Sequence, residues 1–162
     1  MKEWSDWWGI ESTHFHGQNV VSCEIFTGPT WTTLVGAYLP HSTLEDLPDV
    51  NEVLQQFNGR DPIVLGDLNM ELENTRSSQS QRVADPLIEY GIIDLVQKFI
   101  QRQCFQYLKT WTQVKQGTVL RSRCYYILGT DWRRFKHVNI RDVHNYTSDQ
   151  FAIQARLFKH PT

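Results

Sequence analysis

The chain has 162 residues, of which 40% are hydrophobic and 12% aromatic, and its formal net charge at pH 7 is −2. This length and composition indicate one globular domain with a sizeable core and exclude a largely disordered chain. No apolar run reaches the ~18 residues needed to cross a bilayer, and the N-terminus lacks the pattern of a signal peptide, so we expect an intracellular protein without a membrane partner.

The charged residues are distributed unevenly along the chain. Residues 1–97 contain 4 Lys or Arg and 15 Asp or Glu, whereas residues 98–162 contain 12 and 3. The basic half either faces a polyanion or complements the acidic half within one folded unit, and charge alone leaves both interpretations open. The three cysteines are widely separated, which predicts neither a disulfide framework nor a zinc site. We predict no small-molecule cofactor.

The first predicted elements are two strands that form a hairpin. Residues 19–26 and 31–38 are rich in β-branched and apolar residues and are joined by Thr-Gly-Pro-Thr. In residues 49–57, apolar residues recur at the i, i+3, i+4 and i+7 spacing of a helical stripe. The run Pro62–Leu65 is then wholly apolar, as in a strand in the middle of a covered sheet. This alternation predicts a layered α/β fold.

The second half of the chain predicts shorter elements. Residues 81–88 carry a helical stripe that contains Pro86, so the helix either is kinked there or begins with Asp85 as its N-cap. Residues 93–103 are predicted to be helical. Strands are expected at residues 105–112 and 118–128, on either side of a turn at Gln116-Gly117, and at residues 138–143 and 151–158.

A short polar motif, Gly66-Asp67-Leu68-Asn69, directly follows the apolar strand. The carboxyl end of a strand is a common position for functional groups. There the Asp67 carboxylate could orient or deprotonate a water, and the Asn69 amide could donate a hydrogen bond to a phosphate oxygen. The simpler alternative is an Asx turn without a chemical role.

Two further motifs complete a pattern with this one: Arg121–Gly129 has the sequence RSRCYYILG, and Ser148–Ile153 has the sequence SDQFAI. In this order and spacing, the three motifs resemble the endonuclease/exonuclease/phosphatase superfamily, which has the DNase I-like fold. The resemblance is closest to the endonuclease domain that precedes the reverse transcriptase in non-LTR retrotransposons. It implies an α/β (α+β) four-layer sandwich that lacks its N-terminal strands, with residues 18–162 as a partial domain and residues 1–17 as an extension without a family match.

The resemblance implies a metal-dependent phosphodiesterase that acts on DNA, in which Mg²⁺ activates water and neutralises charge on the phosphodiester. It assigns Tyr38 to positioning the phosphate, Asp67 to orienting the attacking water and Asn69 to stabilising the phosphoryl oxygens. It also assigns Asp149 to the metal. From the residues alone, Tyr38 is equally a core-edge tyrosine, Asp67 a turn residue and Asp149 a cap at the start of a strand.

Two positions depart from the family's motifs. Tyr125 stands where the resemblance expects Asp, and Gln150 stands where it expects the catalytic His that this Asp holds. Gln can neither accept a proton nor carry a positive charge. The family's early Asn and metal-binding Glu are also unmatched, and Glu11 is interpreted as a surface acid. We therefore predict a degenerate retrotransposon-type endonuclease domain with an open sheet edge, weak Mg²⁺ binding and no efficient phosphodiesterase activity.

Two alternative functions remain open. One is an active Mg²⁺-dependent nuclease or phosphodiesterase in which another histidine replaces the missing one, the candidates being His14, His16, His41, His137 and His144. The other is a non-catalytic nucleic-acid-binding module whose phosphate contacts are Arg121, Arg123, Arg133, Arg134 and Lys136. Binding through such contacts weakens as the salt concentration rises.

Overall fold

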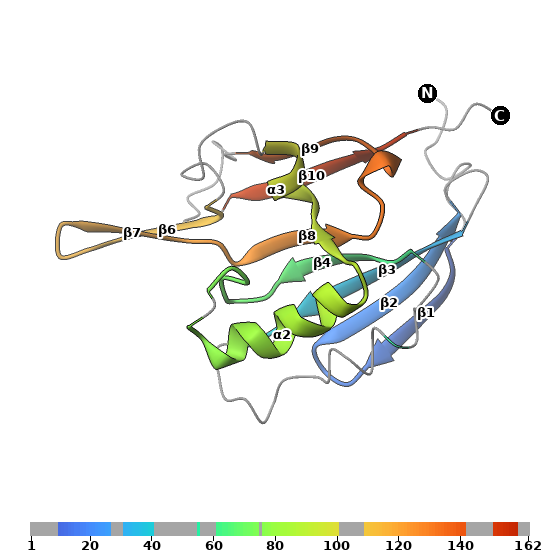
Figure 1. Ribbon diagram of the computed structural model, residues 1–162, viewed down its shortest axis with the longest axis horizontal. Coiled ribbons are helices and arrows are strands. Elements are labelled where there is room, and N and C mark those ends of the chain that lie inside the picture. The colour runs from blue at the N-terminus through green and yellow to red at the C-terminus, as the bar shows by residue number, and fades with distance from the viewer. Residues whose placement is uncertain are drawn as a thin grey trace.

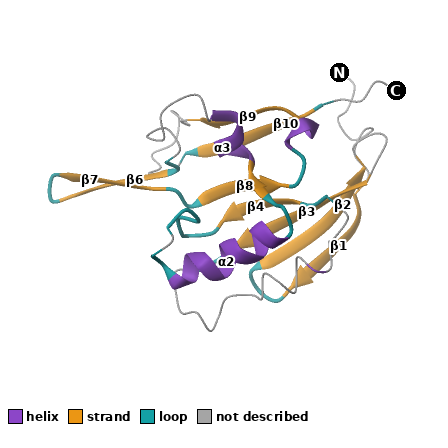
Figure 2. Ribbon diagram, in the orientation of Figure 1, coloured by secondary structure: helices purple, strands orange, loops and turns teal. Residues whose placement is uncertain are grey.

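The computed structural model describes residues 10–26, 31–40, 55, 61–74, 76–100, 109–141 and 151–158. The helix expected at residues 49–57 lies outside these ranges, except for Gln55, which is helical. Strands dominate the described part and form one six-stranded sheet and two two-stranded sheets (Figure 2). No helix in the described part is both long enough and apolar enough to cross a membrane.

The six-stranded sheet is mixed and has the strand order β1-β2-β3-β4-β8-β5 (Figure 1). Its strands are β1 (Ile10–His16), β2 (Val20–Phe26), β3 (Trp31–Tyr38), β4 (Ile63–Asp67), β5 (Ile93–Asp94) and β8 (Tyr125–Gly129). The β3–β4 pair is parallel, and the other neighbouring pairs are antiparallel. The predicted hairpin strands are confirmed. The apolar strand is also confirmed, and Ile63 and Val64 are buried in the cores on opposite faces of the sheet.

Strand β1 lies at an edge of this sheet, within the segment expected to be an N-terminal extension. It pairs antiparallel with β2, and His16 is opposite Val20. The His16 ring is hydrogen-bonded to the Ser22 hydroxyl, with 2.8 Å between Nε2 and Oγ. Residues 10–16 are therefore part of the main sheet.

Helix α2 (Ser78–Glu89) covers one face of the main sheet. The core on this face includes buried residues from the helix and four strands, Val20, Val35, Val64, Val83, Leu87, Tyr126 and Leu128, and four from loops, Leu39, Leu68, Met70 and Ile92. Ser77 is the N-cap of the helix, and its side chain accepts a hydrogen bond from the Ser80 amide. The alternative in which the helix begins at Asp85 is therefore wrong, because the Ser77 cap starts it about two turns earlier and Pro86 lies inside it.

A two-stranded sheet and a short helix cover the other face. Strands β9 (Phe135–Arg141) and β10 (Ala152–Leu157) pair antiparallel, as the sequence predicts, and helix α3 (Leu95–Ile100) packs beside β8 and β9. The core on this face consists of buried apolar residues from these elements and β4: Ile63, Leu95, Val96, Ile127, Phe135 and Val138. Ile93 and Asp94 pair with β8 as strand β5, so the helix expected over residues 93–103 begins later. The predicted layered arrangement is confirmed.

Strands β6 (Trp111–Lys115) and β7 (Thr118–Ser122) form a hairpin that extends away from the main sheet (Figure 1). Its turn lies at Gln116 and Gly117, as predicted, with φ angles of 50° and 77°. The single strand expected over residues 118–128 is divided at Arg123 and Cys124, because β7 and β8 belong to different sheets. A single turn of 3₁₀-helix, Trp132–Arg134, joins β8 to β9.

We expect Gly66→Ala to destabilise the sheet, because a Cβ at Gly66 would lie 1.8 Å from the Ala37 carbonyl oxygen and the φ angle of Gly66 is +150°. The atoms that this Cβ meets all belong to the Ala37 backbone and cannot move aside cheaply, so the free energy of unfolding in urea should fall by about 3 kcal/mol. In the control Gly129→Ala, the nearest atom is a terminal methyl of the Leu95 side chain at 3.2 Å, and the loss should be much smaller. Equal losses would contradict this account.

Candidate functional site

The strand register places three candidate site residues side by side. Tyr38 is opposite Asp67 in the parallel β3–β4 pair, and Asp67 is opposite Tyr125 in the antiparallel β4–β8 pair. Residues opposite one another in a sheet share a face, and this face is the one that β9 and β10 cover. Tyr38, Asp67 and Tyr125 therefore lie abreast on three neighbouring strands, where β3 and β4 end. Of these, Tyr38 is the most accessible, with 53% of its surface exposed.

The loop after β4 holds the Asp67 and Asn69 side chains close to the strand ends. The Asn69 amide N–H donates to Asp67 Oδ1 at 2.9 Å, which forms the Asx turn considered above. The Asn69 side-chain Nδ2 donates to the Leu39 carbonyl at 2.9 Å. The backbone ties the loop to both neighbouring strands, because Leu39 N donates to Asp67 O and Leu68 N donates to Cys124 O. The Asx turn thus exists, and it orients the two polar side chains.

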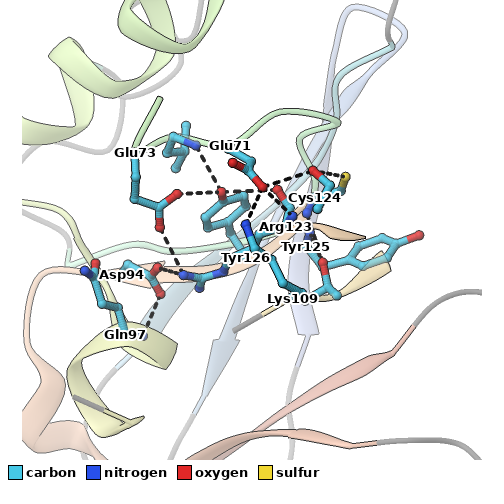
Figure 3. A network of polar contacts seen from close by, with 12 residues as sticks. Glu71, Glu73, Asp94, Gln97, Lys109, Arg123, Cys124, Tyr125 and Tyr126 are labelled. Carbon is cyan, nitrogen blue, oxygen red and sulfur yellow. Dashed lines mark hydrogen bonds and ion pairs between the residues drawn. The ribbon is translucent and has the colours of Figure 1, made fainter. Parts of the chain in front are cut away.

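Arg123 and Tyr126 bind the next four residues of this loop. Arg123 N donates to Glu71 Oε1, and Tyr126 packs its ring 4.5 Å from the Arg123 guanidinium. The loop groups that these two residues hold are Met70 O, Glu71 Oε1, Leu72 N and the Glu73 carboxylate (Figure 3). The loop that carries Asp67 and Asn69 is therefore fixed to the junction between β7 and β8.

The Arg123 side chain is buried, with 2% of its surface exposed. It forms ion pairs with Asp94 at 2.5 Å and with Glu73 at 3.2 Å. Its Nε and Nη2 atoms have no hydrogen-bond partner in the part of the chain that the structure describes. Burial, followed by the Glu73 carboxylate, raises the pKa of the Tyr126 hydroxyl, so Tyr126 acts here as a neutral donor and acceptor.

Glu71 and Lys109 form a third ion pair of the network. Glu71 Oε1 accepts a bond from Lys109 Nζ at 2.5 Å and from Ser122 Oγ at 3.3 Å. Burial acts to raise the pKa of Glu71, but the hydrogen bond and charge of Lys109, together with the hydrogen bonds from Arg123 N and Ser122 Oγ, outweigh it, so that the pKa lies below its ordinary value. Burial raises the pKa of the neighbouring Cys124 thiol, and the Asp67 and Glu71 carboxylates act in the same direction.

The prediction that Arg123 contacts a nucleic-acid phosphate is wrong, because its guanidinium is buried against Asp94 and Glu73. The Arg134 guanidinium donates hydrogen bonds to the Asp61 carbonyl and the Thr32 hydroxyl. These partners lie where β3 and β4 begin, at the opposite end of the strands from Asp67.

The other basic residues predicted to bind phosphate lie at different ends of the fold. Arg133 is next to Arg134, is exposed and pairs with Asp131. Arg121 is exposed on the β6–β7 hairpin, opposite Thr112. The predicted phosphate contacts thus do not form one surface.

Thr110 is a structural residue of the site that the sequence did not single out. It is completely buried, and its hydroxyl accepts hydrogen bonds from the Cys124 and Tyr125 amides at 2.9 and 3.0 Å. Its carbonyl accepts a bond from the Phe151 amide. Thr110 therefore links the end of β8 that carries Tyr125 to the residue before β10. Its only sequence signal is its position in the Leu108–Gln113 run, LKTWTQ.

Asp149, Gln150, His41 and His144 lie outside the described residues. The other histidines considered as substitutes lie away from Asp67. His14 and His16 are on β1, three strands from β4, which corresponds to about 14 Å. His137 is on the outer side of β9, near the end where Arg134 lies.

The described residues do not fit a Mg²⁺ site. Asp67 is a lone carboxylate there, and Glu71 is paired with Lys109. Within the described ranges, no three His, Cys, Asp or Glu side chains lie close enough together to hold a metal ion. Mg²⁺ requires an octahedral set of oxygen ligands, so we derive no chemical step through a metal.

No protein-family model matches the sequence, and no curated protein matches it. The solved structures that share its architecture include the following three. The endonuclease domain of TRAS1, a telomere-specific non-LTR retrotransposon, has a TM-score of 0.64 and 16% identity over 86% of this chain and 63% of that domain. The 3′ phosphatase NExo from Neisseria, bound to product DNA hairpin, has a TM-score of 0.71 and 14% identity over 93% of this chain and 72% of that one. The AP endonuclease LMAP from Leishmania major has a TM-score of 0.66 and 16% identity over 88% of this chain and 55% of that one.

These likenesses show that the chain has the endonuclease/exonuclease/phosphatase fold, also called DNase I-like, as the sequence resemblance implied. The chain spans 63% of the length of the TRAS1 domain and 55% of the length of LMAP. At sequence identities of 14–16%, these likenesses are evidence for the shared fold alone.

We expect Arg123→Met to destabilise the protein by about 3–5 kcal/mol, because it leaves the Asp94 carboxylate buried without its cation. The free energy of unfolding in urea measures this loss. The matched control is Arg133→Met, which removes an exposed arginine from its pair with Asp131 and should leave stability unchanged within error. If the two variants lose the same stability, the buried cluster does not hold the loop.

We expect Lys109→Met to raise the pKa of Glu71, because the ammonium that offsets burial is removed. In the wild type, the lowered pKa stabilises the fold above the ordinary value of 4.5, and this contribution is lost as the pH falls through the lowered pKa. Titration of the Glu71 side-chain carboxyl carbon by NMR measures the change. The control Arg121→Met should leave the Glu71 pKa unchanged, and a similar rise there would overturn the assignment to Lys109.

Proposed function

We propose that this chain is a nucleic-acid-binding domain of retrotransposon-endonuclease type that hydrolyses phosphodiester bonds inefficiently. The observation that supports this most directly is the identity of the residue on β8 that lies opposite Asp67. The β4–β8 register places Tyr125 there, where the resemblance expects an aspartate that holds a catalytic histidine. A phenol is uncharged at neutral pH, so it cannot hold and stabilise an imidazolium as a carboxylate does.

The remaining site residues can bind and orient a phosphodiester. The Asp67 carboxylate accepts a hydrogen bond from the Asn69 backbone N–H, and it can also orient a water molecule at the strand ends. Asn69 Nδ2 uses one N–H for the Leu39 carbonyl, and its second N–H can donate to a phosphoryl oxygen. The exposed Tyr38 hydroxyl can donate to another phosphoryl oxygen. These groups position a substrate without providing the charged acid-base pair.

The loss of the Asp-His pair has an expected size. In serine proteases, removal of a member of the catalytic triad lowers the rate by about 10⁴-fold, while binding and electrostatic contacts retain part of the acceleration. By analogy, Tyr125 and Gln150 would leave a domain that binds its substrate but turns it over very slowly. The sequence resemblance assigns Mg²⁺ to Asp149, which lies outside the described residues.

DNA is the proposed ligand. The NExo neighbour is bound to a product DNA hairpin, and the TRAS1 neighbour is an endonuclease domain. Binding without hydrolysis is the second candidate function, and a specific observation favours it. The exposed basic residues of β9 and β10 make no ion pair with a described residue.

Plasmid nicking in Mg²⁺ or Mn²⁺ tests the proposal. We expect the wild type to nick barely above the Asp67→Asn variant, which lacks the carboxylate that orients water. The variant Tyr125→Asp/Gln150→His should be compared with the wild type in fusions that carry the N-terminal segment of an active relative, which supplies the Asn and Glu expected from the resemblance. The double variant should then be faster by about 10⁴-fold.

The single variants Tyr125→Asp and Gln150→His are the internal controls. Each should gain little in the fusion, because the two residues act as a unit. Equal nicking by the two fusions, or rapid Asp67-dependent nicking by the unmodified chain, would overturn the proposal and favour an active nuclease with a different proton acceptor.

A further inference from the structure

The two-stranded sheet of β9 and β10 has one apolar face and one polar face. Side chains on alternate positions, including Val138, Ile140, Ile153 and Ala155, pack in the core against the main sheet. The residues between them share the opposite side, because successive side chains of a strand point to opposite faces. This outer ribbon face consists of His137, Asn139 and Arg141 from β9 and Gln154 and Arg156 from β10.

The outer ribbon face and its margin are basic. His137, Arg141 and Arg156 are exposed, and Lys136 is exposed beside them, at the register shift between the strands. Neither β9 nor β10 contains an aspartate or a glutamate. None of these four basic side chains forms an ion pair with a described residue. By contrast, Lys109, Arg123 and Arg133 are each paired with a carboxylate.

Two amides lie in the middle of this face. Asn139 and Gln154 are directly opposite each other in the β9–β10 register. Their oxygens, Oδ1 and Oε1, are buried and have no hydrogen-bond partner in the described part of the chain. Both residues are half-buried, and each side-chain amide has two N–H donors that can bond to a ligand. Arginine and amide donors together are the groups that proteins commonly use to contact phosphates.

We propose that the outer ribbon face is a second nucleic-acid-binding surface, which contacts the phosphodiester backbone without reading sequence. A strand of seven residues is about 20 Å long, enough to follow several consecutive phosphates of one DNA strand. His137 is the one aromatic side chain of this face, and the face has no large apolar side chain that could enter a groove. Contacts to phosphates alone position DNA but carry no sequence information.

The outer ribbon face is distinct from the strand-end site but runs toward it. Arg141 is opposite Ala152, and Phe151 is hydrogen-bonded to Thr110, whose hydroxyl holds the Tyr125 amide. Arg156, His137 and Lys136 lie toward the opposite end of the ribbon. A backbone that follows the face from Arg156 to Arg141 therefore approaches the end of the main sheet that carries Asp67. The inference rests on the proposed nucleic-acid ligand but not on hydrolysis.

Fluorescence anisotropy with a short labelled DNA duplex, in EDTA and over a series of salt concentrations, tests the inference. We expect Arg141→Gln/Arg156→Gln to weaken binding about tenfold at low salt and to reduce the slope of log K against log salt by about two units. The matched control is Arg76→Gln/Arg82→Gln, which removes the same net charge from exposed residues at and before helix α2. It should retain the wild-type slope, as should Arg141→Lys/Arg156→Lys, which retains both charges.

The outcomes separate this inference from the proposed function. Equal weakening in the glutamine variant and the matched control would show a general effect of net charge, and no binding by the wild type would also overturn the inference. A second duplex of shuffled sequence should bind equally, and a strong preference for one sequence would contradict backbone contact. Because anisotropy is measured in EDTA, a failure of the wild type to nick plasmid in Mg²⁺ leaves the binding result intact.

Discussion

The burial of one arginine organises the part of the fold that carries the candidate site. Arg123 lies in the short link between β7 of the hairpin and β8 of the main sheet, and its charge is matched by Asp94 on β5 and Glu73 on the loop after β4. A charge in this position requires both carboxylates and the Tyr126 ring to remain in place, since an unpaired ion in a protein interior is very costly. The position of the loop with Asp67 and Asn69 thus depends on this buried cluster around Arg123, which is not itself part of the proposed substrate site.

The basic residues of the second half of the chain have two different surroundings in the structure. Part of the basic half complements the acidic half internally, as the Arg123–Glu73, Arg123–Asp94 and Lys109–Glu71 pairs show. Another part, on β9 and β10, is exposed and has no described acidic partner. The two interpretations of the charge distribution are therefore both realised, on different surfaces of the same domain.

The sequence predicted the fold well where hydrophobic periodicity and turn residues agree. The strands of the first hairpin, the apolar strand β4 and the Gln116-Gly117 turn follow from local patterns alone. Local patterns failed where pairing with a distant strand determines the secondary structure. Ile93 and Asp94 were predicted to be helical but pair with β8 as a strand of the main sheet. Arg123 was misjudged for a similar reason: its partners are about 30 and 50 residues away, and no spacing rule links them. The residues of the candidate site were predicted from the motif resemblance, whereas their alignment on neighbouring strands is known only from the structure.

The β6–β7 hairpin has a practical consequence for engineering this domain. Its strands pair with each other, and Lys115, Thr118 and the turn between them are exposed, as are Val114 and Val119 on facing positions. Neither hydrophobic core includes a residue of the hairpin. The tip is therefore a suitable insertion point for a reporter peptide or a foreign loop, since a longer connection there adds little closure entropy and leaves both cores intact.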